Sequence, residues 1–433
     1  MTLPQTKPSE SAAPTVPTES AAESAAESAA ESIAGAGVQS AAGSIAGSIA
    51  GAAAEAAAPA QRAAEPAAAT GIPRAPLRKY RDVAPEGDVP TTRTTGLHPD
   101  FWYPLARSRD LKAGKTLAVK FAGTPIVLVR PRSGAPYALE DRCAHRQVPL
   151  SMGVVKDEQL LCGYHCWAYD RTGACVSIPY LDRGRTLPNG VRNYACREAY
   201  GFVFVFTGDQ TLAEGTPMPE LPSYSDPRYK ARVLDRDIAC HYSFMHENLM
   251  DMNHQFLHRS LMGRIRAKLL DVREGEDWLE ADYSFSRTEG KQSLGERFII
   301  GSGNTDKYAD LMTIRTGYPY QTLRYWTDGD RDEPPALDLW NAYMPTDREQ
   351  RHNHTYGLIM VQKPPVPGAI HLLWPFITLF TEAIFGQDRV IVEAEQGAYE
   401  SQGADLNNEV FPIIQSLKSL LARRGIPLPA GGN

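Results

Sequence analysis

Short apolar runs, bounded by Gly, Pro and Asp, dominate the chain between residues 100 and 210. Some alternate with polar positions and others are rich in β-branched or aromatic residues, and both patterns are typical of strands. The clearest runs are 116–121, 125–130, 160–161 and 201–206. We therefore expect a small antiparallel β domain from about residue 101 to residue 208.

After residue 209 the sequence contains both strand-like alternation and helical spacing of apolar residues. Strand-like patterns cover 278–285 and 356–361, helical spacing covers 247–258, and a long helix is expected after Gly386. Periodicity alone indicates mixed α and β structure here. We expect an α+β fold, with the small domain over 76–208 and a larger domain over 209–427.

Residues 369–380 are mostly apolar. A transmembrane helix needs about 20 apolar residues, so this stretch is too short and too interrupted to span a bilayer. Buried core or a substrate pocket is the favoured interpretation. The alternatives are a channel wall or a patch that contacts lipid or a hydrophobic substrate.

The first seventy residues are almost all Ala, Ser, Gly, Glu, Pro and Thr, with no aromatic residue. Glutamates recur every fourth position over 19–31, and like charges at this spacing oppose a helix. Such a segment cannot bury enough apolar area to offset its conformational entropy. We expect residues 1–75 to form a disordered or transiently helical tail.

Charge and cysteine content narrow the function classes. The 433-residue chain has a net charge of −6, and residues 1–70, with seven acidic and two basic residues, account for most of it. No basic excess favours nucleic acid. Six cysteines without a secretory signal do not suggest a disulfide framework. We expect a cytoplasmic enzyme.

Two cysteine–histidine pairs carry the strongest chemical signal. They are Cys143 with His145, and Cys162 with His165. Two thiolates and two imidazoles at this spacing fit a Rieske [2Fe–2S] centre, in which cysteines hold one iron and histidines the other. Zinc is the first competing metal. The usual zinc spacing, however, pairs Cys with Cys and His with His at short range.

A second polar stripe lies about ninety residues further on. In a helix, His254 and His258 are one turn apart and point the same way, with Asp251 on nearly the same face. Two such imidazoles supply two-thirds of a 2-His-1-carboxylate triad, which leaves positions open on Fe(II). Alone, such a pair is more often an exposed or hydrogen-bonded one.

The cluster loops resemble those of the Rieske non-haem iron oxygenases, the ring-hydroxylating and demethylating enzymes. The matching runs are DRCAHRQVPLSMG and LLCGYHCWAYDRTGAC. Ala144 stands where the family often has Pro, and Cys166 where it usually has Gly. Neither departure removes a ligand. The resemblance implies a small antiparallel β domain for the cluster and a helix-grip catalytic domain with an antiparallel sheet.

The same resemblance assigns roles around the second stripe. The family carries Asn-x2-Asp-x2-His and a further histidine, and Asn248, Asp251, His254 and His258 match this pattern. It implies that the two histidines bind the mononuclear iron and that Asp251 bridges a cluster histidine to one of them. Asn248 would lie beside the ligands.

The third iron ligand is expected far along the chain. The run 385–396 resembles the demethylating members, in which an acidic or amide residue precedes the Asp ligand. This implies Asp388 as the carboxylate, with Glu393 as the runner-up. Arg389 could pair with Glu393 over one helical turn and leave Asp388 free to face the iron.

The resemblance implies a terminal oxygenase that takes electrons from a ferredoxin or flavin reductase and uses O2 as co-substrate. Monooxygenation or oxidative demethylation of a hydrophobic substrate, aromatic or sterol- or terpenoid-like, is favoured over dioxygenation. Family members are trimers, so a homotrimer is expected, and peripheral membrane contact is a weaker expectation. The alternatives are a Rieske electron carrier without catalysis and a binding protein with a degenerate iron site.

Overall fold

The computed structural model describes residues 92–182, 184–289, 310–327 and 329–428. The tail expected over residues 1–75 lies outside these ranges.

The small domain consists of short antiparallel strands. In the described residues they form sheets with the orders β10-β5-β4-β3, β11-β12-β2 and β6-β7-β8-β9. The strands are β2 (Trp102–Arg107), β3 (Lys115–Phe121), β4 (Thr124–Arg130), β5 (Tyr137–Glu140), β6 (Val154–Lys156), β7 (Gln159–Leu161), β8 (Ala168–Tyr169), β9 (Cys175–Ser177), β10 (Asn193–Tyr194), β11 (Cys196–Ala199) and β12 (Phe202–Phe206). The strands expected from the apolar runs are confirmed.

The large domain is built on a seven-stranded antiparallel sheet of order β13-β19-β18-β17-β16-β15-β14. Its strands are β13 (Tyr229–Ile238), β14 (Arg264–Glu274), β15 (Trp278–Glu289), β16 (Asp310–Gly317), β17 (Tyr320–Trp326), β18 (Leu337–Pro345) and β19 (Asn353–Gln362). The strands predicted at 278–285 and 356–361 are confirmed as parts of β15 and β19. The fold is α+β, as expected.

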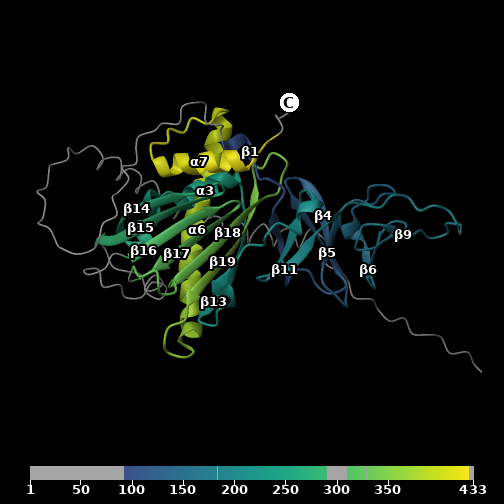
Figure 1. Ribbon diagram of the computed structural model, residues 1–433, viewed down its shortest axis with the longest axis horizontal. Coiled ribbons are helices and arrows are strands. Elements are labelled where there is room, and N and C mark those ends of the chain that lie inside the picture. Colours follow the sequence, from purple (N-terminus) through teal and green to yellow (C-terminus); the bar gives the residue numbers. More distant parts are fainter. Residues whose placement is uncertain (1–91, 183, 290–309, 328, 429–433) are drawn as a thin grey trace, which may run out of the picture. The chain divides into compact units, whose positions relative to one another are not determined.

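Helices pack against this sheet. Within the described residues the helices are α2 (Pro222–Ser225), α3 (Tyr242–Met250), α4 (Arg259–Met262), α6 (Ala369–Gln402) and α7 (Pro412–Arg424). The 3-10 helices are η1 (Thr92–Thr94), η2 (Leu150–Met152), η3 (Gln210–Leu212) and η4 (Met252–His258), and β1 (Thr95–Gly96) pairs with β20 (Ile426–Pro427). In Figure 1, α6 lies behind the strands, and α3 packs against α7 at one end of the sheet.

The expected start of the long helix was wrong. Helix α6 begins at Ala369, so Gly386 lies in its middle. Pro375 removes one backbone donor near the first turns, but the helix continues through it. By length and composition alone α6 could cross a membrane, with a mean hydropathy of 1.4 in its most apolar window, of which 17% is buried.

The interpretation of residues 369–380 as buried core holds for one face only. Ile370, Ile377 and Phe380 are buried against the sheet side. Leu372 and Leu379 are 78% and 71% exposed. The helical period of 3.6 residues separates these two faces. Both faces are apolar in composition, but one packs in the core and the other is exposed.

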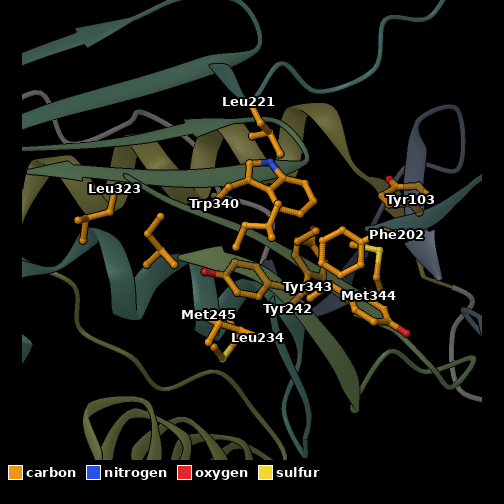
Figure 2. Packing of buried hydrophobic residues seen from close by; sticks show 14 of the residues in the cluster. Tyr103, Phe202, Leu221, Leu234, Tyr242, Met245, Leu323, Trp340, Tyr343 and Met344 are labelled. Atoms are coloured by element: carbon orange, nitrogen blue, oxygen red, sulfur yellow. The ribbon is translucent and has the colours of Figure 1, made fainter. Parts of the chain in front are cut away.

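Aromatic side chains fill the core where the two domains meet. Figure 2 shows Trp340 and Tyr343 of β18 near Phe202 of β12, and the Phe202 and Trp340 ring centroids are 6.2 Å apart. The Tyr356 hydroxyl of β19 donates to the Leu105 carbonyl of β2 at 2.8 Å. The small domain is therefore attached to the large one through β2 and β12.

Candidate metal centres

The two cluster loops have the same backbone design. In each, the cysteine carbonyl accepts a hydrogen bond from the amide four residues on, and the cysteine amide donates to the carbonyl five residues on. The fourth residue has a left-handed conformation in both loops, with φ of 62° at Gln147 and 55° at Cys166. Glycine adopts this conformation most readily. This explains why a glycine suits the position of Cys166 and why a cysteine can still occupy it.

These loops bury the thiols and expose the imidazoles. Cys143 and Cys162 are each 2% exposed, whereas His145 and His165 lie at the surface. The two imidazole centroids are 4.6 Å apart, and His145 stacks on Trp167 at 4.6 Å. One end of the site is thus enclosed by protein and the other faces outward.

The thiols fit a metal cluster chemically. Burial raises the pKa of the Cys162 thiol, and the neighbouring Cys143 raises it further. Two adjacent buried thiols are costly to ionise without a cation, and iron removes that cost because it binds the thiolate. The Tyr169 hydroxyl lies 3.2 Å from Cys143 Sγ and accepts from the Ala144 amide at 3.0 Å. Sequence reasoning missed Tyr169, whose only signal was its place four residues after His165.

The structure brings His254, His258 and Asp388 together. Their nearest ligand atoms all lie within 4.8 Å of one another. Asp388 Oδ1 is 3.2 Å from His258 Nε2 and 3.9 Å from His254 Nε2. Glu393 is held elsewhere, because it accepts from Arg389 at 2.8 Å and from the Ala239 amide at 3.0 Å. The expected Arg389–Glu393 pair is present.

Each histidine is oriented through its other ring nitrogen. His254 Nδ1 is 2.5 Å from the Asp251 carbonyl oxygen, and His258 Nδ1 is 2.9 Å from Gln387 Oε1. Both acceptors are oxygens, so each Nδ1 carries the proton and each Nε2 presents a lone pair toward Asp388. Gln387 was not singled out from the sequence. Its signal was an amide directly before the candidate carboxylate.

The local helix differs from the expected one. Helix α3 ends at Met250, and Asp251 begins the 3-10 helix η4 by accepting from the Asn253 amide through Oδ1 at 2.9 Å. The histidines therefore lie on a 3-10 helix, not on a continuing α-helix. Asn248 is half-buried in the last turn of α3.

The unpartnered atoms point to a cation. His258 Nε2 and Asp388 Oδ1 are buried, and no described residue gives either of them a hydrogen bond within normal geometry. Burial lowers the pKa of His254, which favours the neutral ring that a metal needs. Burial also lowers the pKa of His258, but Asp388 outweighs it and raises that pKa overall. Two imidazoles and one carboxylate fit a mononuclear iron, because they leave coordination positions free.

Family profiles match both halves of the chain. Residues 101–195 match the Rieske [2Fe-2S] domain. Residues 238–413 match the C-terminal domain of the vanillate O-demethylase oxygenase.

Known proteins match along most of the described chain. A 4beta-methylsterol monooxygenase of Methylococcus capsulatus is 31% identical over 76% of this chain and 88% of that protein. The oxygenase component of dicamba O-demethylase from Stenotrophomonas maltophilia is 32% identical over 55% of this chain and 62% of that protein. The crystal structure of dicamba monooxygenase bound to dicamba has a TM-score of 0.61 at 21% identity, covering 76% of this chain and 98% of that one.

Proposed function

Because this chain belongs to the Rieske non-haem iron oxygenases, we propose that it is a monooxygenase acting on a bulky hydrophobic substrate of the sterol or terpenoid class. It is a terminal oxygenase with a [2Fe–2S] cluster and a mononuclear iron. The proposed substrate class rests on how much of each relative's length aligns with this chain. The methylsterol monooxygenase aligns over 88% of its length, against 62% for the dicamba enzyme.

The iron, when bound, supplies reductive activation of O2, and the cluster, when bound, supplies single electrons for it. His254 and His258 hold their Nε2 lone pairs toward the site because their Nδ1 protons are engaged. Asp388 adds one negative charge in a buried setting. The net reaction turns a C–H bond, O2, two electrons and two protons into a C–OH group and water.

A second substrate class has its own support. The catalytic half matches the domain of a vanillate O-demethylase, and that enzyme's name implies removal of an aromatic O-methyl group. Hydroxylation of such a methyl group releases formaldehyde. An aromatic methyl ether is therefore the second candidate.

The electrons come from outside this chain. Members of the family receive them from a ferredoxin or a flavin reductase, and the 433 residues contain no dinucleotide-binding fingerprint. We propose a ferredoxin or flavin reductase in the cytoplasm as the donor. None of the six cysteines forms a disulfide, which agrees with a reducing compartment.

We also propose a homotrimer in which the cluster of one subunit faces the iron of the next. Support comes from the surface position of His145 and His165, which leaves them accessible to a second copy. Asp251, directly before η4 and bonded through its carbonyl to His254, is the proposed bridge between the two sites.

Product analysis tests the substrate class. Purified protein with its metals restored would be incubated with a generic ferredoxin, a reductase and NADH. One reaction would contain a 4-methylsterol and another a methoxybenzoate. We expect mass spectrometry to find a hydroxylated or further oxidised sterol methyl group that carries label from 18O2. Formaldehyde from the methoxybenzoate, with an unchanged sterol, would favour the second candidate.

A further inference from the structure

Helix α6 has an exposed apolar stripe on the side opposite the iron site. Leu372 is 78% exposed, Phe376 52%, Leu379 71% and Val390 47%. Their spacings of four, three and eleven residues place them on one face of an α-helix. At 1.5 Å per residue the stripe is about 27 Å long. Isolated exposed apolar residues are ordinary, but Leu372, Phe376 and Leu379 stand together within about two turns, and a contiguous apolar patch of this kind marks a contact surface.

The opposite face of α6 excludes a membrane-spanning role. Ile377, Asp388 and Val392 are buried on that face, and Asp388 faces the two candidate iron ligands. A spanning helix would have to remove this carboxylate from its site. A helix with one face in the protein core and one apolar face exposed can lie only along a surface.

Cations lie along one side of α6, toward β13 and β2. A groove of about 760 Å³ beside α6 is lined partly by Trp374, Glu382 and Gly386 of that helix. Its charged lining residues are Arg107, Arg109, Arg232, Arg236, Arg389, Asp235 and Glu382. Five arginines thus meet two carboxylates. Arg232 and Arg236 share Glu382.

Carboxylates outside the groove reduce this excess from three positive charges to one. Asp110 pairs with Arg107 and Glu393 with Arg389. Lys230 of β13 adds to the positive side, because its Nζ lies 3.0 Å from His371 Nδ1 and 4.5 Å from the Trp374 ring centroid near the beginning of α6.

We propose that this face of α6, with the arginines and Lys230 beside it, docks the enzyme on an anionic phospholipid surface. The apolar stripe would enter the boundary between headgroups and acyl chains, and the cations would contact lipid phosphates. This combination of an apolar face and a basic margin is what holds interfacial helices on membranes. The inference stands on α6 and does not depend on the proposed substrate.

Vesicle sedimentation of the full-length, metal-loaded protein tests the docking surface. The probes are phosphatidylcholine vesicles with and without phosphatidylglycerol. We expect binding to the anionic vesicles that weakens as salt is added, because salt screens the cations. The triple variant Leu372→Ser, Phe376→Ser, Leu379→Ser should bind at least about tenfold more weakly, since it loses most of the inserted apolar area.

A matched control separates this face from general surface hydrophobicity. Leu406 and Val410 are 70% and 68% exposed but lie in the segment between α6 and α7. The variant Leu406→Ser, Val410→Ser should bind vesicles as the unchanged protein does. Iron content and the cluster spectrum would establish that both variants are folded.

Two results would overturn the proposal. One is absence of binding to the anionic vesicles, or equal binding by the triple variant. The other result is that the anionic vesicles bind neither protein and that the triple variant sediments as a smaller species than the unchanged protein. That outcome would make the stripe an interface between copies of this chain.

Discussion

The four cluster residues lie close together in the sequence, within residues 143–165. The iron-site residues come from two distant segments, and His258 and Gln387, which are in contact, are 129 residues apart in the sequence. In the small domain, two loops of the same design each supply one thiol and one imidazole. In the large domain, η4 and α6 must pack against each other before a site exists. The cluster site therefore depends mainly on local loop structure, whereas the iron site forms only when the large domain is folded.

Burial differs as well. The cluster imidazoles His145 and His165 are exposed, while His258 is only 4% exposed. An electron relay has to be approached by its partners. An oxygen-activating site benefits from exclusion of water, because electrostatic interactions strengthen in a low dielectric. The two histidine pairs are therefore placed for different tasks, and substitutions in each should have separable effects.

The largest effect is expected from Asp388→Ala. This change removes the only carboxylate near both Nε2 atoms in the described residues, so the mononuclear iron and all product formation should be lost. The cluster spectrum should persist because the small domain is untouched. Metal analysis should fall from three irons per chain to two.

Glu393→Ala is the matched control for Asp388. Glu393 lies on the same helix but is bonded to Arg389 and the Ala239 amide. It should keep three irons per chain. If Glu393→Ala loses the mononuclear iron and Asp388→Ala keeps it, the ligand assignment is wrong.

Substitution of a cluster histidine should have the opposite effect, with loss of the Rieske cluster signal and retention of the mononuclear iron. His145→Ala or His165→Ala should abolish or convert the reduced Rieske EPR signal, since imidazole ligation distinguishes this cluster. Mononuclear iron should remain, because η4 and α6 are unaffected. Zinc without acid-labile sulfide in the unchanged protein would contradict the cluster itself.

The sequence was informative where the chemistry is local. The cysteine–histidine pairs and the strands of the small domain could be predicted because their signals lie within a few residues. The helix containing His254 could not, since a 3-10 or α-helical path after Met250 depends on how Asp251 caps the turn. The beginning of α6 was misplaced because Pro375 and Gly386 look like helix breakers. Gln387 was missed because its partner is 129 positions away.

Asp251→Asn tests communication between the two sites. Both metals should stay bound, because Asp251 contacts His254 through its backbone carbonyl. Electron transfer from cluster to iron should slow by about a hundredfold, because a misplacement of about 1 Å between reacting groups can cost that much in rate. Stopped-flow reoxidation of the reduced cluster measures it. An unchanged rate, or an active strict monomer, would contradict the bridge.

Gln387→Leu should have a smaller effect on the iron site. His258 would lose the acceptor for its Nδ1 proton, so its ring would be less firmly oriented. Loss of such a partner costs about 10- to 100-fold in metal affinity. Iron titration followed by EPR of the nitric oxide adduct measures this. Gln387→Glu, which keeps an acceptor oxygen, should retain most of the affinity; equal losses in both variants would contradict an orienting role.

The smallest effect, a change in the free energy of unfolding, is expected at the ion pairs that connect the two domains. His354 of β19 lies 2.5 Å from Asp235 and 2.6 Å from Asp237, and Asp235 also pairs with Arg107 of β2 at 2.7 Å. Burial lowers the pKa of His354, but the hydrogen bonds that its ring donates to both carboxylates outweigh burial and raise that pKa above its usual value. The protonated ring therefore stabilises the folded state fully below the unfolded pKa of about 6.5. This stabilisation is lost as pH rises through the raised value.

His354→Gln should accordingly lower the free energy of unfolding by about 1 kcal/mol or less near pH 6, because the pair is partly exposed. The difference from the unchanged protein should shrink by about pH 9, where the ring is neutral. Urea unfolding at both pH values measures it. Asp237 is 85% exposed and Asp235 16%, so Asp235→Asn should cost more stability than Asp237→Asn. A His354→Gln difference that does not change with pH would mean that packing of the ring, rather than its charge, stabilises this junction between the cluster domain and the catalytic domain.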